Sequence, residues 1–284
     1  MKHLRDERPT LPSVRVIYAD LDGTILGPGG SLFAGPHGGT TLAAAEAIEA
    51  LHLAGLDLVV MSGRTRRSAE VARSLGAKAF IAELGALVVE GFGAKERVIR
   101  TDGVGKRSTF DAILRNGAGG FLLERYPGRL LPVAPWAEVA LQLHGLVDAT
   151  EVTRALAEAG YGRLELRDNG RLRRMYTELE VDEVRAYHLL PKGVSKASAV
   201  RLHRERHGIE AAEAVAVGDS PADLEVAGEV GSFFLVANGV DAIGDAEPWP
   251  PNAYVTEAER GDGFAEAVRC VVGALRSRGG AADT

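Results

Sequence analysis

An apolar stretch at residues 14–19 runs directly into the pentapeptide Asp-Leu-Asp-Gly-Thr at residues 20–24, and this junction restricts the possible folds. The apolar stretch predicts a buried strand. Asp20 and Asp22 therefore lie where a strand gives way to a loop, the edge at which open α/β sheets bind ligands. Two neighbouring carboxylates repel each other unless a proton or a cation intervenes. The junction thus predicts a site for a hard divalent ion such as Mg²⁺, which prefers oxygen ligands.

The composition is that of a globular protein with one large domain or two modest ones. The chain has 284 residues, of which 46% are hydrophobic and 25% charged. A net charge of -6 without a long basic run argues against nucleic acid as the main partner. The single cysteine, Cys270, has no partner for an internal disulfide.

No apolar stretch is long enough to span a membrane, so we expect no membrane partner. Residues 1–13 are polar and lack the apolar centre of a signal peptide. We expect them to form a flexible tail and the protein to be cytoplasmic.

Residues 14–85 alternate between strand-like and helix-like patterns, and the alternation returns over residues 191–284. This order predicts an α/β core with a Rossmann-like parallel sheet and right-handed crossovers. Residues 86–190 are irregular, with a predicted helix near 107–115 and a turn at 168–170. We expect them to form a separate, inserted α+β domain.

The segment 27–39 is rich in glycine and proline, and we expect no packed element there. It directly follows the acidic pair. Two interpretations remain open, a surface insertion and a mobile flap over the site.

The residues at the strand ends fit phosphoryl transfer, which needs a nucleophile, a proton donor, a metal and groups that hold the phosphoryl oxygens. Asp20 could attack phosphorus and form an aspartyl-phosphate. Asp22 could protonate the leaving alkoxide and then activate water. The alternative for a lone pair of this kind is a capped turn with solvated carboxylates.

Two further segments offer donors for a phosphoryl group. Ser62, Gly63 and Arg64 follow the second predicted strand, where a hydroxyl and backbone N–H groups at a helix start suit phosphoryl oxygens. Lys192 and Lys196 precede a predicted helix, and either could neutralise the nucleophile and the phosphoryl group.

A second acidic pair follows the predicted strand at 214–217. Asp219 and Asp223 are four residues apart across a helix start, so one helical turn brings them together. Carboxylates are also favoured at a helix start without any ligand. Together with Asp20 and Asp22, however, they form an acidic cluster that calls for a cation.

These four segments, in this order, resemble those of the haloacid dehalogenase-like hydrolase superfamily. The resemblance is carried by DLDGT, the serine after the second strand, VSKASAV and GDSPAD. It implies Mg²⁺ as the cofactor. By position it implies the nucleophile Asp20, the general acid/base Asp22, the phosphoryl-binding hydroxyl of Ser62 and the phosphate lysine Lys196. It also implies a metal set of Asp20, Asp22 (through its carbonyl), Asp219 and Asp223, the last as ligand or as orienter. Beside these, we expect Thr24, Gly63 and Arg64 to bind the substrate.

The spacing of the four segments indicates which type of inserted domain this superfamily member would have. Residues 25–61 have room for one loop and one helix, whereas residues 63–195 have room for a large insertion. This resembles the C2-type cap of the Cof-like group, which includes sugar phosphatases, mannosyl-3-phosphoglycerate phosphatase and sucrose-phosphate phosphatase. The chain departs from that group at Leu84 and Ala222, where the group often has asparagine.

In such enzymes the cap selects the substrate. Alternation puts Arg171 and Arg173 on one strand face, either to bind a second polar group of the substrate or as a solvated basic strand.

We expect hydrolysis of a small phosphorylated metabolite, a sugar phosphate or a glycosyl-phosphoglycerate. The alternatives are a phosphoglycolate phosphatase, a phosphomutase and a non-catalytic sugar-phosphate binding module. A P-type transport ATPase is excluded because the sequence has no membrane spans.

Overall fold

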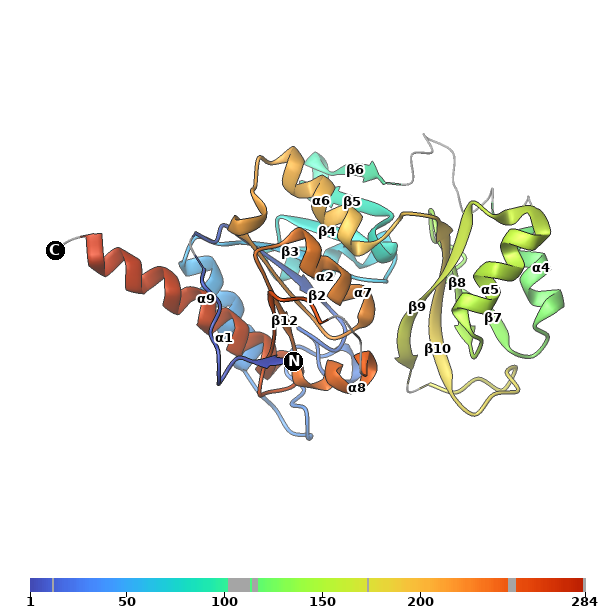
Figure 1. Ribbon diagram of the computed structural model, residues 1–284, viewed down its shortest axis with the longest axis horizontal. Coiled ribbons are helices and arrows are strands. Elements are labelled where there is room, and N and C mark those ends of the chain that lie inside the picture. The colour runs from blue at the N-terminus through green and yellow to red at the C-terminus, as the bar shows by residue number, and fades with distance from the viewer. Residues whose placement is uncertain (12, 102–112, 114–116, 173, 245–248, 283–284) are drawn as a thin grey trace.

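The protein consists of a core built on one large sheet and a cap built on a small one (Figure 1). The computed structural model describes residues 1–11, 13–101, 113, 117–172, 174–244 and 249–282, with side chains to residue 277. Over this part of the chain the core sheet has nine strands and the cap sheet four. The α/β class with an inserted α+β cap is thereby confirmed.

The core strands lie side by side in an order typical of parallel α/β folds. In sheet order the strands are β1 (Lys2–His3), β13 (Ala253–Val255), β12 (Ser232–Leu235), β11 (Ala214–Gly218), β2 (Val16–Asp20), β3 (Asp57–Met61), β4 (Ala79–Ala82), β5 (Leu87–Glu90) and β6 (Arg97–Arg100). Neighbouring strands in this order are parallel as far as β4, whereas β5 pairs antiparallel with β4 and β6 antiparallel with β5.

Helices cover both faces of the core sheet. The core helices are α1 (Ala43–Leu53), α2 (Ala69–Ser74), α6 (Lys196–Arg206), α7 (Pro221–Leu224), α8 (Val240–Ile243) and α9 (Arg260–Ala282). Side-chain alternation along β2 divides its residues between two hydrophobic clusters. Ile17 and Ala19 face the cluster built with α1, α2 and α9, and Val16 and Tyr18 face the cluster built with α6.

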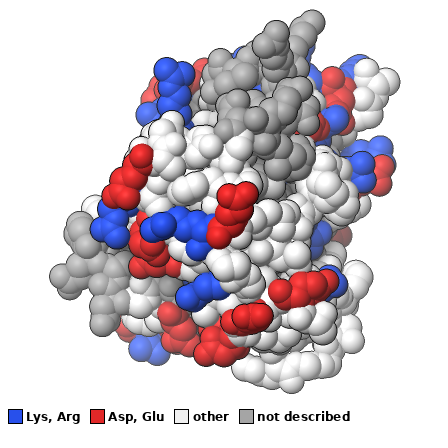
Figure 2. All heavy atoms as spheres, turned by 90° about the vertical axis from the view of Figure 1, so that its right-hand side faces the viewer, with Lys and Arg blue, Asp and Glu red and all other residues white. Residues whose placement is uncertain are grey.

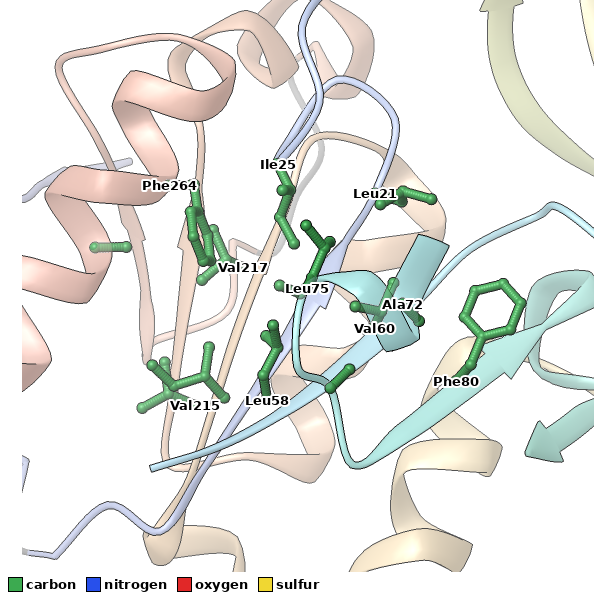
Figure 3. Packing of buried hydrophobic residues seen from close by; sticks show 14 of the residues in the cluster. Leu21, Ile25, Leu58, Val60, Ala72, Leu75, Phe80, Val215, Val217 and Phe264 are labelled. Carbon is green, nitrogen blue, oxygen red and sulfur yellow. The ribbon is translucent and has the colours of Figure 1, made fainter. Parts of the chain in front are cut away.

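Close packing on the first face holds the central strands in place (Figure 3). Leu58 of β3 and Val215 of β11 lie in this cluster with Phe264 of α9, and all three are fully or almost fully buried. Burying a side chain of this size contributes about 1.5–3 kcal/mol each. The strand ends that carry the polar residues thus rest on a rigid base.

Within the described residues, the cap is an antiparallel sheet with two helices on the side away from the core (Figure 1). Its sheet order is β7 (Leu130–Val133), β8 (Leu141–Gly145), β10 (Val184–Pro191) and β9 (Leu164–Leu172), and its helices are α4 (Ala118–Arg125) and α5 (Ala149–Leu156). Figure 2 shows its outer face, on which acidic and basic side chains lie next to one another. Within the described residues, no helix has both the length and the apolar character needed to cross a bilayer.

The prediction of a flexible tail over residues 1–13 is wrong for its described part. Strand β1 pairs with β13, and Leu4 and Leu11 are buried. The segment is polar overall, and its pattern does not indicate that these two leucines anchor it.

The predicted start of the inserted domain, residue 86, is also wrong. Strands β5 and β6 extend the core sheet, so the core continues to Arg100. These strands turn back on β4 as antiparallel neighbours, and this break in the βα alternation resembled a domain boundary in the sequence. The predicted helix near 107–115 lies outside the described residues, apart from Ile113.

Two predicted loops contain regular structure. Residues 168–170 lie inside β9, where Gly170 has a φ of +96° and the pairing with β10 shifts by one residue, as in a β-bulge. The segment 27–39 contains a 3₁₀ turn at Pro28–Gly30 and backbone bridges, including Gly27 to Ser31. None of the residues of this turn is buried, which agrees with the expectation that no packed element forms in 27–39.

A buried carboxylate joins the core to the cap. Glu83 follows β4, is fully buried and accepts backbone N–H groups of Glu138 (2.9 Å), Val139 (2.9 Å) and Ala140 (2.8 Å) from the cap. Burial raises the pKa of Glu83, and the three N–H groups oppose that rise by favouring the ionised form.

The variant Glu83→Gln should lower the free energy of unfolding by about 1–3 kcal/mol, because an amide cannot accept all three buried N–H groups. Urea titration followed by circular dichroism measures the difference. Glu49→Gln, an exposed position on α1, is the matched control and should change stability by less than about 0.5 kcal/mol. Equal stabilities of the two variants would contradict the assigned role of Glu83.

Candidate active site

The end of β2 delivers Asp20 to the edge of the sheet and turns the chain sharply there. Asp20 is the last residue of the strand and is 5% exposed. Gly23 has a φ of +90°, and a Cβ at this position would lie 2.2 Å from Oδ2 of Asp219. Only glycine fits both the backbone angle and this close approach. The loop after β2 thereby lies directly against Asp219.

Lys196 lies between two carboxylates at the start of α6. Its Nζ donates to Oδ1 of Asp20 at 2.6 Å and to Oδ1 of Asp223 at 2.7 Å, and the side chain is almost completely buried. Burial disfavours the ammonium, but the two carboxylates outweigh burial and raise the pKa of Lys196. Lys192, the alternative from the sequence, is exposed.

Asp223 has hydrogen-bond donors on both of its carboxylate oxygens. Oδ1 accepts from Lys196, and Oδ2 accepts from Oγ and N of Ser220, at 2.6 and 3.1 Å, and from N of Asp219 at 3.3 Å. Ser220 caps α7, so the helix start fixes this carboxylate in place. Asp223 therefore has little lone-pair capacity left.

Asp219 follows β11 and is oriented by a residue that the sequence analysis missed. Nδ2 of Asn238 donates to Oδ2 of Asp219 at 3.2 Å and to the carbonyl of Gly23 at 3.0 Å. Oγ1 of Thr24 donates to Oδ1 of Asp219 at 3.4 Å. The available signal was the run Ala-Asn-Gly at 237–239 just after a strand, at the same sheet edge as Asp20.

Three carboxylates face a single lysine in this cluster. Oxygen atoms of Asp20, Asp219 and Asp223 lie within 4.8 Å of one another. Burial raises the pKa of Asp20 well above its usual range, with Asp223 and Asp219 adding to the rise and Lys196 opposing it. Burial and Asp223 raise the pKa of Asp219 to about 7. This surplus of buried negative charge fits a divalent cation with oxygen ligands.

Ser62 and Arg64 lie on the next strand end. Ser62 follows β3, is 2% exposed, and accepts the N–H of Arg64 on Oγ at 3.1 Å. Nε and Nη2 of Arg64 donate to the two oxygens of Asp22, at 2.7 and 2.5 Å. The Asp22 side chain is 50% exposed and stands apart from the buried carboxylate cluster. The two acids of the DLDGT run thus have different surroundings.

The cap closes over Gly63. The carbonyl of Gly63 accepts from Nε2 of His188 at 2.9 Å and from Nε2 of Gln142 at 3.1 Å. A Cβ at Gly63 would lie 2.3 Å from Nδ2 of Asn169. Strands β8, β9 and β10 of the cap therefore sit directly on the loop that holds Ser62.

Core and cap together line a cleft of about 1110 Å³. Arg171 lines its cap side, is 71% exposed and pairs with Glu183 at 3.2 Å. Arg173, the other predicted cap residue, lies outside the described residues. The cleft-lining residues that the sequence analysis had named are Asp20, Asp22, Ser62, Gly63, Arg64, Arg171, Lys196 and Asp219.

Two phosphoglycolate phosphatases match this chain over different lengths. A phosphoglycolate phosphatase of Methanosarcina acetivorans is 40% identical over 88 residues, which cover 31% of this chain and only 37% of that relative. A phosphoglycolate phosphatase of Methanoculleus marisnigri is 30% identical over 260 residues, which cover 90% of this chain and 96% of the relative.

A solved structure shares the fold. The sucrose-phosphatase of Synechocystis, in complex with sucrose and phosphate, has a TM-score of 0.63 at 18% identity and covers 90% of this chain and 97% of its own. A family model described as haloacid dehalogenase-like hydrolase matches residues 174–268, which include Lys196, Asp219 and Asp223. The chain belongs to the haloacid dehalogenase-like hydrolases, in their Cof-like group.

Proposed function

We propose that the protein is a Mg²⁺-dependent phosphomonoesterase that acts on a small phosphorylated metabolite through an aspartyl-phosphate on Asp20. The observation that carries this proposal is the arrangement around Lys196. One buried ammonium holds Asp20 and Asp223, while Asp219 and Asp22 border the same cleft. A purely structural ion pair would require neither an adjoining cleft nor more carboxylates than the lysine can neutralise.

Asp20 and Asp22 divide the chemistry. Lys196 occupies Oδ1 of Asp20 and leaves Oδ2 to attack phosphorus, so that an O–P bond forms as the bond to the leaving oxygen breaks. Asp22 gives its proton to the leaving alkoxide. In the second step Asp22 takes a proton from water, which attacks the phosphoryl group and restores the Asp20 carboxylate.

The phosphoryl oxygens need donors on the side away from the leaving group. Ser62 Oγ and the backbone N–H groups after β3 supply them, and Lys196 supplies positive charge. Arg64 holds Asp22 at the mouth of the cleft by two hydrogen bonds. These bonds favour the ionised carboxylate, the form that Asp22 needs as the base of the second step, so we infer that Arg64 releases Asp22 before it acts as the acid of the first.

The metal would be held by the carboxylates of Asp20 and Asp219 and, by the family resemblance, by the carbonyl of Asp22. Asp223, whose oxygens already accept several donors, orients Lys196 and the loop of Asp219 rather than binding the ion. When bound, Mg²⁺ neutralises charge on the carboxylates and on the phosphoryl group.

Two substrate classes have separate support. Phosphoglycolate is supported by the relative that is 30% identical over almost its whole length. A sugar phosphate is supported by the cap side of the cleft. There the polar side chains of Gln142, His144 and Asn169 line the cleft, and such groups can form hydrogen bonds with sugar hydroxyls.

A panel of phosphorylated metabolites assayed for released phosphate tests the proposal and separates these classes. Faster turnover of phosphoglycolate than of every sugar phosphate would support the first class, and the reverse order would support the second. Isomerised product without released phosphate would identify a phosphomutase. Binding without either product would leave only the non-catalytic binding module.

Asp20→Asn should lower kcat for p-nitrophenyl phosphate by more than roughly a thousandfold, because the amide is a poor nucleophile. Steady-state release of p-nitrophenol measures the loss. Asp57→Asn, an exposed aspartate at the start of β3, is the matched control and should keep full activity. Substantial turnover by the Asp20 variant would refute the covalent mechanism.

Binding of Mg²⁺ should weaken as the pH falls through about 7, the pKa of Asp219. Below that pH the carboxylate is protonated, and binding must release the proton, so the dissociation constant should rise by roughly tenfold per pH unit. Isothermal titration calorimetry in buffers of different ionisation enthalpy measures both the affinity and the proton release. An affinity independent of pH across this range would show that Asp219 does not bind the ion.

Asn238→Ala should weaken Mg²⁺ binding by roughly 10- to 100-fold, because it removes the donor that orients Asp219. Activity measured against Mg²⁺ concentration gives the shift. Asn169→Ala, which alters the cap side of the cleft, is the contrasting variant and should raise KM at an unchanged Mg²⁺ dependence. A Mg²⁺ dependence that is the same in both variants would argue against the role of Asn238.

A further inference from the structure

A second group of metal-ligating side chains lies at the far end of α6 from Lys196. Glu90 ends β5, and His203 and His207 lie at the end of α6 and just after it. Ligand atoms of the three residues lie within 4.8 Å of one another. Glu90 pairs with Ala79, the first residue of β4, whereas Asp20 pairs with Met61, the last residue of β3. The two groups are therefore at opposite edges of the core sheet.

The helix geometry brings the two histidines together on one face. His203 and His207 are four residues apart, which places their side chains one above the other. Their ring centroids are 4.5 Å apart. Nε2 of His207 lies 2.9 Å from Oε1 of Glu90, so the carboxylate already stands beside one imidazole.

The ring of His203 is oriented by a tyrosine behind it. Its Nδ1 lies 2.8 Å from the hydroxyl of Tyr18 on β2, and both residues are buried. When Nδ1 carries the proton and donates to Tyr18, the lone pair of Nε2 is free for a metal. Histidine ligands commonly donate their second N–H to a neighbouring oxygen in this way.

The charged neighbours of the three residues leave one potential ligand atom on each residue free to bind a metal. Arg206 faces Oε2 of Glu90, with its Nη2 3.7 Å away, and leaves Oε1 toward the histidines. His207 is 47% exposed, so water can reach the group and complete the coordination of an ion. A plain ion pair between Glu90 and His207 explains the 2.9 Å contact but not the oriented third side chain.

We propose that Glu90, His203 and His207 form a binding site for one transition-metal ion of the Zn²⁺ class. Two imidazoles and one carboxylate are a ligand set that suits Zn²⁺, whereas Mg²⁺ prefers oxygen ligands alone. The ion would replace the proton between His207 and Glu90 and link α6 to β5. This proposal is independent of the phosphatase activity proposed above.

The test is zinc binding to the full chain, free of any affinity tag, with Mg²⁺ in large excess to occupy the acidic cluster. Equilibrium dialysis with elemental analysis counts the zinc, and thermal unfolding reports whether it binds the folded state. His207→Ala is the main variant because this side chain is half-exposed, and its far-UV circular dichroism verifies that it folds. His37→Ala, an exposed histidine in the segment 27–39, is the matched control.

We expect one zinc ion per chain and a raised unfolding temperature in the wild type and in His37→Ala. His207→Ala should bind zinc at least about tenfold more weakly, the smallest loss seen even for an outer partner of a metal ligand. Glu90→Gln should show a loss in the same direction. Equal zinc binding by the wild type and His207→Ala, or no zinc binding by the wild type, would overturn the proposal.

Discussion

The buried ammonium of Lys196 determines how the active-site segments fit together. Buried charges persist only when they are paired and hydrogen-bonded, and Lys196 meets that condition with Asp20 and Asp223. The three residues come from β2, α6 and α7, so the contact requires distant parts of the chain to converge at one sheet edge. It also leaves the cluster with more negative charge than one lysine can balance, a surplus that fits a bound cation better than an inert ion pair.

The cap is attached to the same edge through one side chain and one backbone carbonyl of the core. Glu83 accepts three cap N–H groups, and the carbonyl of Gly63 accepts two cap side chains. The turn that carries Glu83 is strained, because Glu83 and Leu84 have φ values of 51° and 55°, a conformation that costs roughly 1–2 kcal/mol per residue. Asparagine tolerates that conformation better than leucine, so the side chain of Leu84 adds to the strain of this turn. Here the hydrogen bonds to the cap offset the strain.

The sequence was sufficient for features that depend on local patterns and failed for those that depend on pairing. Asp20, Ser62 and Asp219 each follow an apolar run, so a parallel sheet places them together by its topology alone. Strands β5 and β6 resembled the start of the cap, because an antiparallel return strand has the same local pattern whichever sheet it joins. Asn238 was missed because a single asparagine after a strand resembles an ordinary turn, and its role depends on its distance to Asp219. Gly170 has the turn chemistry that the sequence indicated, but the chain uses it for a bulge inside β9.

Helix α6 runs antiparallel to β2, and two polar contacts fix its register on that strand. Lys196 contacts Asp20 at one end, and His203 contacts Tyr18 about two turns further along. Tyr18 and Asp20 are two residues apart, so they point to the same face of the sheet. The first contact is ionic, and the second is between neutral groups. A metal bound by Glu90, His203 and His207 would add a third constraint on the same helix. It would hold the C-terminal end of α6 against β5, at the opposite end of the helix from Lys196.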